Sequence, residues 1–255
     1  QVWLYDLARQ TLSRFSFEGG TNYNPAWTPD GRRIAYQSIG RTGGGLFWQP
    51  ADSSGKMERV GAAESGCDGN PGSWSPDGHF LVCTLVGDPV TNNDITLLDV
   101  AESVLKPILQ TRFNEGAPVF SPDGHWLAYA SAESGRYEIY VSAYPGLSGK
   151  YQVSTEGGTE PVWNHNGREI FYRNGDKMMA VVITTQPSVS AGKPQVLFQG
   201  QYQPNPTMNA NYDVSSDGQR FLMVKPVSAQ QTAPTQINVV LNWFEELKLR
   251  VPSGN

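Results

Sequence analysis

A short phrase that recurs five times along this chain constrains its fold more than any other feature. Each copy ends in Asp-Gly or Asn-Gly, and the copies begin at Trp27, Trp74, Phe120, Trp163 and Val214. Successive copies are therefore separated by 47, 46, 43 and 51 residues. This spacing suits four short strands with their turns and is too long for a leucine-rich or ankyrin unit. The chain is predicted to be a repeat protein.

The phrase also predicts the local structure of each repeat. An apolar run rich in β-branched and aromatic residues follows every copy, at residues 33–36, 80–83, 126–129, 169–172 and 220–224. Asp-Gly between two such runs is a strong hairpin signal, because glycine accepts a positive φ and the Asp or Asn side chain caps the amides of the turn. The phrase is therefore interpreted as the tight turn between the two inner strands of a repeat.

Two further strands follow in most repeats, so that each reads as a four-stranded antiparallel meander. We predict an all-β fold, a β-propeller of four-stranded antiparallel blades that forms a single domain over residues 1–255. The expected parts are an outer half-blade (1–18), four full blades (24–61, 70–110, 116–155 and 160–200), a last blade (211–242) and a C-terminal tail (243–255).

The number of blades is left open by the pattern. Six blades, with the first and the last incomplete, is the preferred count. In the alternative, the strands within residues 1–18 complete the last blade and close the ring at five. Residues 204–210 and 226–236 are expected to be loops.

Composition narrows the classes of function. The formal charge is −5 and the isoelectric point is about 5.2, with no cluster of Lys and Arg, which argues against a nucleic-acid partner. No run of 18 or more apolar residues is present, so we expect no membrane insertion by this chain itself. Because the sequence opens in mid-strand without an initiator Met, we expect it to be a piece of a longer polypeptide.

The phrase Trp/Phe-Ser/Thr-Pro-Asp-Gly, followed by an Ile/Leu-Ala-Tyr strand, resembles the repeats of TolB-like β-propellers (WD40-like or PD40 repeats). Residues 152–163, 171–179 and 238–247 are similar to the C-terminal propeller of bacterial receptor-type serine/threonine kinases. This resemblance implies a sensor or interaction domain in an extracytoplasmic, periplasmic location. The sequence contains no kinase motif, so any phosphoryl transfer would belong to another part of the protein.

No catalytic residue is assigned. The nearest approach to a nucleophile elbow, around Ser73, lacks the second glycine and falls on a hairpin strand. His79, His125 and His165 are interpreted as exposed turn residues, since propeller symmetry keeps equivalent turns too far apart to share an ion. The chain is therefore not expected to be an enzyme, and no metal ligands and no cofactor are assigned.

Polar loops at one end of the propeller are the candidate ligand-binding site. They lead into each inner strand or link the second strand to the third. The candidate residues are Asn22, Asn24, Asp68, Asn70, Asn114, Glu115, Glu160, Asn209, Asn211, Arg41 and Arg136. The same loops also carry Tyr23, Glu156, Asp88, Asn92, Asn93 and Asp176. Amides and carboxylates on a rigid scaffold suit hydrogen bonding to a peptide or sugar, and acidic groups there could hold calcium; the alternative is ordinary solvated loops.

The leading functional hypothesis is a non-catalytic propeller module that binds a protein or peptide ligand as part of a larger bacterial protein. The alternative is a metal-dependent hydrolase or lactonase of the six-bladed type, acting in the central channel. Such an enzyme would need converging carboxylate and amide ligands and a general base near a bound water.

Overall fold

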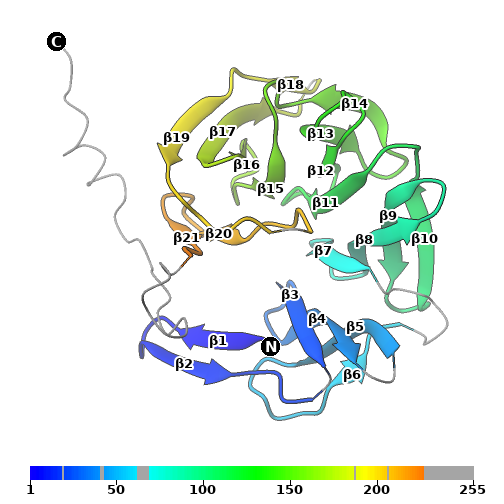
Figure 1. Cartoon of the computed structure of the whole chain (residues 1–255), viewed down its shortest axis with the longest axis vertical. Helices are drawn as coiled ribbons and strands as arrows, with labels where there is room; N and C mark the ends of the chain where they lie inside the picture. Colours follow the sequence, from blue (N-terminus) through cyan, green and yellow to red (C-terminus); the bar gives the residue numbers. More distant parts are fainter. Residues whose placement is uncertain (19, 41–42, 62–68, 187, 206, 227–255) are drawn as a thin grey trace.

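The computed structural model of the chain is a ring of antiparallel β-sheets, which follow one another around a common centre in Figure 1. It describes residues 1–18, 20–40, 43–61, 69–186, 188–205 and 207–226. Within these residues lie three four-stranded sheets, one five-stranded sheet and two two-stranded sheets. The prediction of an all-β fold built from four-stranded antiparallel units is confirmed.

The strands follow chain order within almost every sheet. The first two sheets contain β1 (Trp3–Asp6) and β2 (Thr11–Arg14), then β3 (Thr21–Trp27), β4 (Arg33–Gly40), β5 (Gly43–Pro50) and β6 (Glu58–Arg59). The next two contain β7 (Asn70–Trp74), β8 (Phe80–Asp88), β9 (Asn92–Asp99) and β10 (Val104–Leu109), then β11 (Glu115–Phe120), β12 (Trp126–Ser131), β13 (Glu138–Ala143) and β14 (Ser148–Gln152).

The remaining strands form a five-stranded and a two-stranded sheet. They are β15 (Thr159–Trp163), β16 (Glu169–Asn174), β17 (Lys177–Thr184), β18 (Ser190–Ala191) and β19 (Gln195–Gln199), then β20 (Tyr212–Val214) and β21 (Phe221–Met223). Both β18 and β19 pair with β17, so this sheet has one short strand more than the sequence predicted.

The repeated phrase forms the hairpin turn between the first two strands of each unit. In the β11–β12 turn, Asp123 Oδ1 accepts hydrogen bonds from the Ser121 hydroxyl at 2.5 Å and the His125 amide at 3.1 Å. Gly124 has a φ of 72°, and its amide donates to the Ser121 carbonyl at 2.9 Å. The Asp residues are therefore turn formers, as predicted. His79, His125 and His165 are exposed, which also agrees with the prediction.

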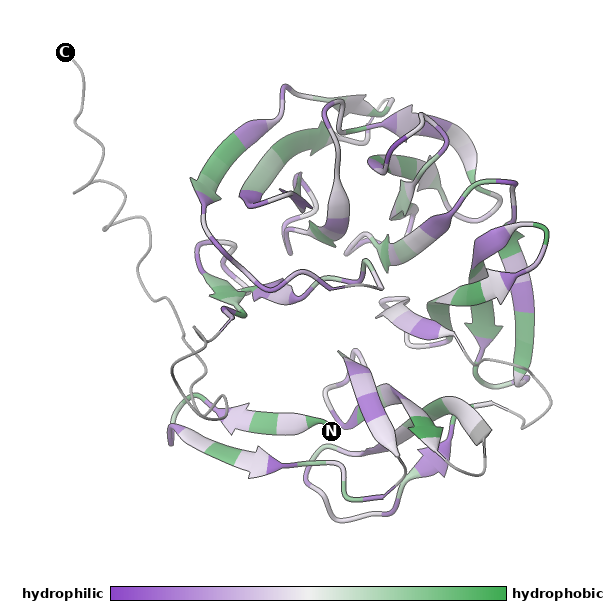
Figure 2. Ribbon diagram, in the orientation of Figure 1, coloured by the Kyte–Doolittle hydropathy of each residue, from purple (hydrophilic) through white to green (hydrophobic). Residues whose placement is uncertain are grey.

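Each full sheet is buried on both faces, because its neighbours in the ring pack against it. Leu127 and Tyr129 face the preceding sheet and contact Val82 and Ile95. Alternating with them, Ala128 and Ala130 face the following sheet, where Trp163, Ile170 and Tyr172 pack. This alternation makes the strands apolar along their length, as Figure 2 shows for β8 and β17, while polar residues collect at their ends.

Closure of the ring remains a prediction. Residues that flank the β1–β2 sheet, Val2 and Phe15, pack against Ile34 and Tyr36 of β4. The β1–β2 sheet shares no strand pairing with β20–β21 among the described residues, where the last sheet has two strands. The rest of the predicted last blade, from residue 227 to 242, and the tail (243–255) lie outside the described residues, so both the six-bladed and the five-bladed interpretations stay open.

Candidate functional site

The starts of the inner strands and the loops between second and third strands lie at one end of the ring. In the third full sheet Glu115 opposes Ser131, and Ser131 opposes Glu138, so all three residues lie at the same edge. The Asp-Gly turns lie at the other end of these strands. We call the end at which Glu115, Ser131 and Glu138 lie the loop-bearing end. The predicted site residues that the structure describes come from the segments that converge there.

Each complete inner strand is irregular close to this end. The pairing register shifts between Tyr23 and Ala26 in β3, and equivalent shifts occur in β7, β11 and β15. Asn24, Ala117 and Glu160 lie within these irregularities and have positive φ values of 52°, 52° and 57°. Such bulges bend a strand and redirect the side chain at the bend. They place Asn24 beside the neighbouring inner strand, where its Nδ2 donates to Asn70 Oδ1 at 3.0 Å.

Residues 203–205 and 207–211, which lead into β20, lie across the inner strands. Figure 1 shows them running from the periphery toward the centre of the ring. Asn205 Nδ2 donates to Asn24 Oδ1 at 3.4 Å, and Asn209 Nδ2 donates to the Pro71 carbonyl at 2.8 Å. Met208 packs so closely on Gly116 that a Cβ there would lie 2.8 Å from its terminal methyl group. We call residues 203–205 and 207–211 the central segment, since they contact β3, β7 and β11 together.

Glu160 anchors the central segment to β15. Its carboxylate accepts hydrogen bonds from the Asn211 amide at 2.9 Å and the Asn205 amide at 3.4 Å. Its carbonyl accepts the Tyr212 hydroxyl at 2.9 Å. Burial raises the pKa of Glu160, although the Asn211 amide and the charge of Arg173 act in the opposite direction. Glu160 therefore organises the protein's own backbone instead of presenting a free carboxylate to solvent.

The structure divides the predicted site residues into two groups. The first is buried and hydrogen-bonded within the protein, and it consists of Asn22, Asn70, Glu115, Glu160 and Asn209. The second retains exposed surface, and it consists of Asn24, Asn114, Asn211 and Arg136. Arg41 and Asp68 lie outside the described residues. Folding therefore uses five of these groups internally, and a ligand-binding role for the others stays a prediction.

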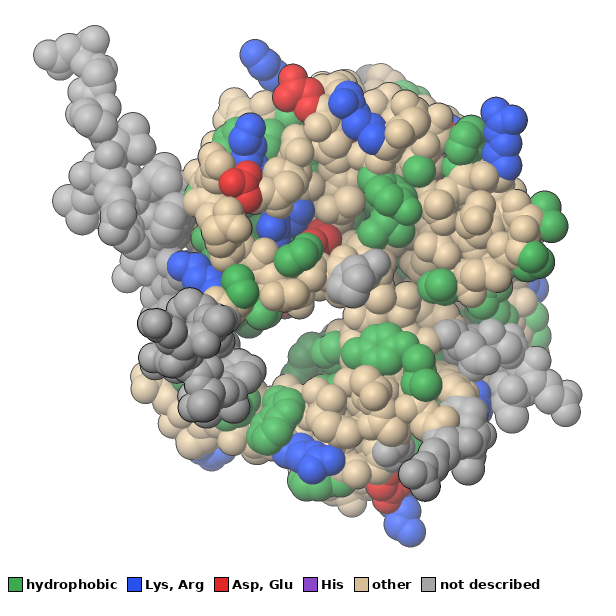
Figure 3. Space-filling model, viewed as in Figure 1, with side chains coloured by type: hydrophobic (Ala, Val, Ile, Leu, Met, Phe, Trp, Pro, Cys, Tyr) green, Lys and Arg blue, Asp and Glu red, His purple; other side chains and the backbone are tan. Residues whose placement is uncertain are grey.

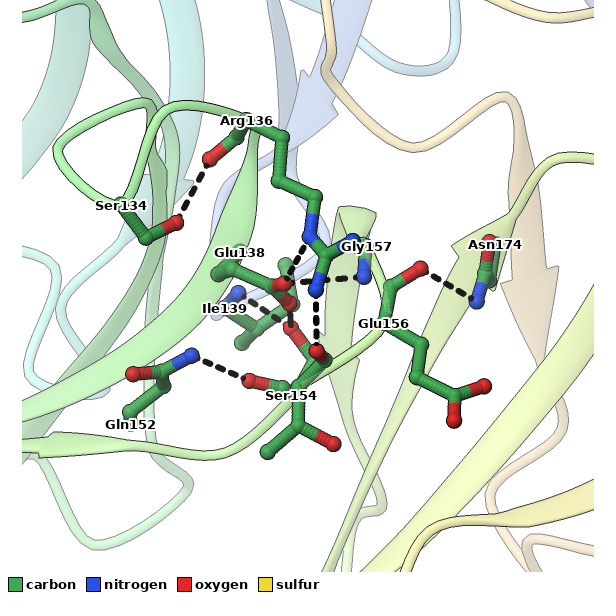
Figure 4. A network of polar contacts seen from close by, with 10 residues as sticks. Ser134, Arg136, Glu138, Ile139, Gln152, Ser154, Glu156, Gly157 and Asn174 are labelled. Atoms are coloured by element: carbon green, nitrogen blue, oxygen red, sulfur yellow. Dashed lines mark hydrogen bonds and ion pairs between the residues drawn. The ribbon is translucent and has the colours of Figure 1, made fainter.

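Arg136 is exposed but not free. Its Nε donates to Glu138 Oε1 at 2.7 Å and its Nη2 to the Thr155 carbonyl at 2.5 Å, as Figure 4 shows. Glu138 also accepts hydrogen bonds from the Ser154 hydroxyl and, at 2.9 Å, from the Gly157 amide. Arg136 thus pins the loop before β13 to the linker between β14 and β15, and its first role is structural.

Sequence reasoning misses several groups at this end. Asn205 and Met208 lie in a segment whose sequence predicts a plain loop, and the backbone carbonyl of Pro71 has no sequence signal at all. Arg173 is also buried, and its Nη2 donates to the Gly175 carbonyl at 2.8 Å. One signal was available: linker 200–211 is about twice as long as linkers 110–114 and 153–158. Extra length in one linker of a repeat protein marks a local specialisation.

The arrangement suits recognition by hydrogen bonds. Within the described residues, no group of three or more His, Cys, Asp or Glu side chains is placed to hold a metal ion. The same part of the chain contains no helix long and apolar enough to cross a membrane. Lys and Arg side chains are scattered singly over the face shown in Figure 3 and form no basic stripe.

Comparisons with known proteins agree with this architecture. The family described as "TolB beta propeller domain" (PD40) matches residues 23–230. TolB from Acinetobacter baumannii is 19% identical with a TM-score of 0.62, over 87% of this chain and 55% of that protein. A chain from the crystal structure of a nidogen/laminin complex is 11% identical with a TM-score of 0.63, over 87% of this chain and 80% of the other.

An oligogalacturonate lyase solved in complex with manganese is 15% identical with a TM-score of 0.59, over 89% of this chain and 65% of the lyase. At these identities the structural likenesses establish the fold and nothing more. The chain spans little more than half the length of the Acinetobacter protein.

Proposed function

This chain belongs to the TolB β-propeller domain family, and from that premise we propose that it is a non-catalytic module that binds a protein or peptide through its loop-bearing end. We further propose that it works outside the cytoplasm as the sensor or interaction domain of a larger bacterial protein. The kinase-type propellers that it resembles support this setting. The nidogen/laminin complex offers a precedent for a chain of similar shape in a protein complex.

One observation carries the proposal: the loop-bearing end already binds a polypeptide, namely the chain's own central segment. Asn24, Glu160 and the Pro71 carbonyl receive amide groups from that segment, some from its backbone and some from Asn side chains. A surface that satisfies the polar groups of one extended segment has the chemistry to recognise another. The partly exposed residues Tyr23, Asn24, Asn114, Thr207 and Asn211 are the proposed contacts.

The competing function is catalysis, for which the manganese-containing lyase is the relevant neighbour. Against it stands the position of the central segment, which lies across the inner strands where a channel-centred site would be. Asn209 and Met208 are both buried against those strands. Substrate would therefore have to displace this segment before reaching the axis.

Site-specific photocrosslinking in producing cells, with the full-length protein, tests the proposal. Crosslinkers at Tyr23 and Asn114 report on the loop-bearing end, while crosslinkers at His79 and His125 are matched controls on exposed turns at the other end. We expect a discrete protein adduct from the first pair only. The identified partner should then bind the purified domain, and Asn114→Ala together with Asn24→Ala should weaken that binding about tenfold or more. Equal adducts at both ends, or turnover of lactone or pectic oligosaccharide substrates, would contradict it.

A further inference from the structure

Two buried carboxylates lie at the interface between the β7–β10 and β11–β14 sheets, on either side of one short linker. The side chains of Asp94, in β9, and Glu115, at the start of β11, belong to residues that are each 1% exposed. Asp94 Oδ2 accepts hydrogen bonds from the Thr91 hydroxyl at 2.7 Å and Gln110 Nε2 at 3.0 Å. Glu115 Oε1 accepts from the Thr111 hydroxyl at 2.5 Å. The two carboxylates are thus held by adjacent residues of a single linker.

Each carboxylate uses one oxygen and leaves the other without a partner. Asp94 Oδ1 and Glu115 Oε2 are fully buried, and neither has a hydrogen-bond partner. The charge of Asp94 acts on Glu115: burial raises the pKa of Glu115, and the neighbouring Asp94 raises it further. Among the described residues no Lys, Arg or His nitrogen lies within 4.0 Å of either group.

The next interface around the ring, between the β11–β14 sheet and the sheet that begins with β15, contains a cation that the first interface lacks among its described residues. Glu138 occupies the position of Asp94, one residue before a fully buried isoleucine, Ile139 or Ile95. Unlike Asp94, it has a cation, because the Arg136 guanidinium donates to it at 2.7 Å. Buried carboxylates are normally paired with a positive charge or with a metal ion. The first interface contains two carboxylates and supplies no such charge from its described residues.

We propose that Asp94 and Glu115 together bind a hard divalent cation, Ca²⁺ in preference to Mg²⁺, between these two sheets. The two unpartnered carboxylate oxygens are the anionic ligands. Gln110 is exposed and Thr111 partly exposed, so water can reach this edge and complete the coordination. Calcium tolerates an irregular set of six to eight oxygen ligands, whereas magnesium demands a near-ideal octahedron. The proposed site uses none of the contacts of the central segment and none of the residues assigned to the binding function proposed above.

Calcium binding to the purified wild-type protein, stripped with EDTA, tests the proposal by calorimetric titration and by thermal unfolding. We expect one site per chain and a rise of about 5 °C or more in the unfolding midpoint once Ca²⁺ exceeds its Kd about a hundredfold. Mg²⁺ should produce a markedly smaller shift. Asp94→Asn and Glu115→Gln should each lose the calcium-dependent shift and remain folded. Glu102→Gln, which changes an exposed carboxylate next to the same sheet, is the matched control and should keep it.

Three results would overturn the proposal. The first is the absence of any stoichiometric calcium in the wild type, and the second is an unchanged calcium shift in both Asp94→Asn and Glu115→Gln. The third is neutralisation by a proton alone. In that case Ca²⁺ would have no effect, and wild-type stability in EDTA would fall as the pH rises through the raised pKa of Glu115.

Discussion

Two neighbouring interfaces of the ring each bury a carboxylate between sheets, and they stabilise it in different ways. In both, a carboxylate near the start of a third strand is buried between sheets near the loop-bearing end. Glu138 accepts a guanidinium, a hydroxyl and a backbone amide. Asp94 has two neutral donors on one oxygen and a second carboxylate, Glu115, close by. The charge of Glu138 is balanced by a guanidinium of the same chain, whereas no described residue supplies a cation to Asp94 or Glu115.

The difference arises in the linkers that enter the inner strands. Ser154 and Gln110 each lie within two residues of the end of an outer strand, and each donates to the carboxylate of its own sheet. The linkers then diverge: Gly158 precedes its repeated phrase by the same five residues as Glu115 precedes the earlier copy. A Cβ on Gly158 would lie 2.7 Å from the Ser154 hydroxyl, so no larger residue fits without a shift. Equivalent repeats with the same backbone arrangement can therefore differ in whether the chain itself supplies a cation to a buried carboxylate.

Removing the charge of Glu138 gives the largest expected effect. Glu138→Gln keeps the shape of the side chain but takes away the ion pair. When its oxygen accepts from Arg136 and Gly157, its NH2 group faces the Ser154 hydroxyl, which can then no longer donate to it. We expect a loss of about 3 kcal/mol in the free energy of unfolding, measured by urea denaturation. Glu102→Gln serves as the control and should change stability by less than about 0.5 kcal/mol. A loss below about 1 kcal/mol would mean that the Arg136–Glu138 ion pair contributes little to the stability of this interface.

Replacing a buried carboxylate by its amide should raise the free energy of unfolding, instead of lowering it, at the interface that contains Asp94. Asp94→Asn, measured in EDTA, replaces a buried carboxylate that has no cation partner among the described residues, and it keeps the oxygen that accepts from Thr91 and Gln110. We expect the variant to be about 1 kcal/mol more stable than wild type under these conditions. The measurement is urea denaturation with and without Ca²⁺. A destabilisation of similar size to that of Glu138→Gln would show that the two interfaces do not differ in the way described.

The local features of the fold could be predicted because their causes are local. The Asp123-Gly124 turn depends on a side chain that caps amides within two residues and on a glycine at positive φ. Alternation of apolar residues then predicts the strands, and the period of the repeat predicts the ring. The path of the central segment could not be predicted in this way. Its contacts join residues up to 181 positions apart, and no short-range pattern encodes them.

The candidate site shows the same limit. Asn70, Glu115 and Glu160 read as solvated loop residues in the sequence, because a polar side chain looks the same whether water or the protein satisfies it. Their actual partners come from other sheets and linkers. Asp94 is missed for a related reason, since it follows Asn92 and Asn93 and reads as the end of a polar loop. Its burial depends on how two sheets pack, which periodicity alone does not specify.

The smallest effect is expected for Arg136→Met, which distinguishes the contribution of the cation to stability from that of the neutral donors around Glu138. The Arg136 side chain is 60% exposed, so solvent screens its ion pair and Arg136→Met should cost only about 1 kcal/mol in the free energy of unfolding. The Ser154 hydroxyl and Gly157 amide remain as donors in this variant. A double-mutant cycle with Glu138→Gln measures the coupling directly. A coupling near zero would mean that neutral donors suffice for a carboxylate at this position, and Asp94 would then no longer require a cation on grounds of charge.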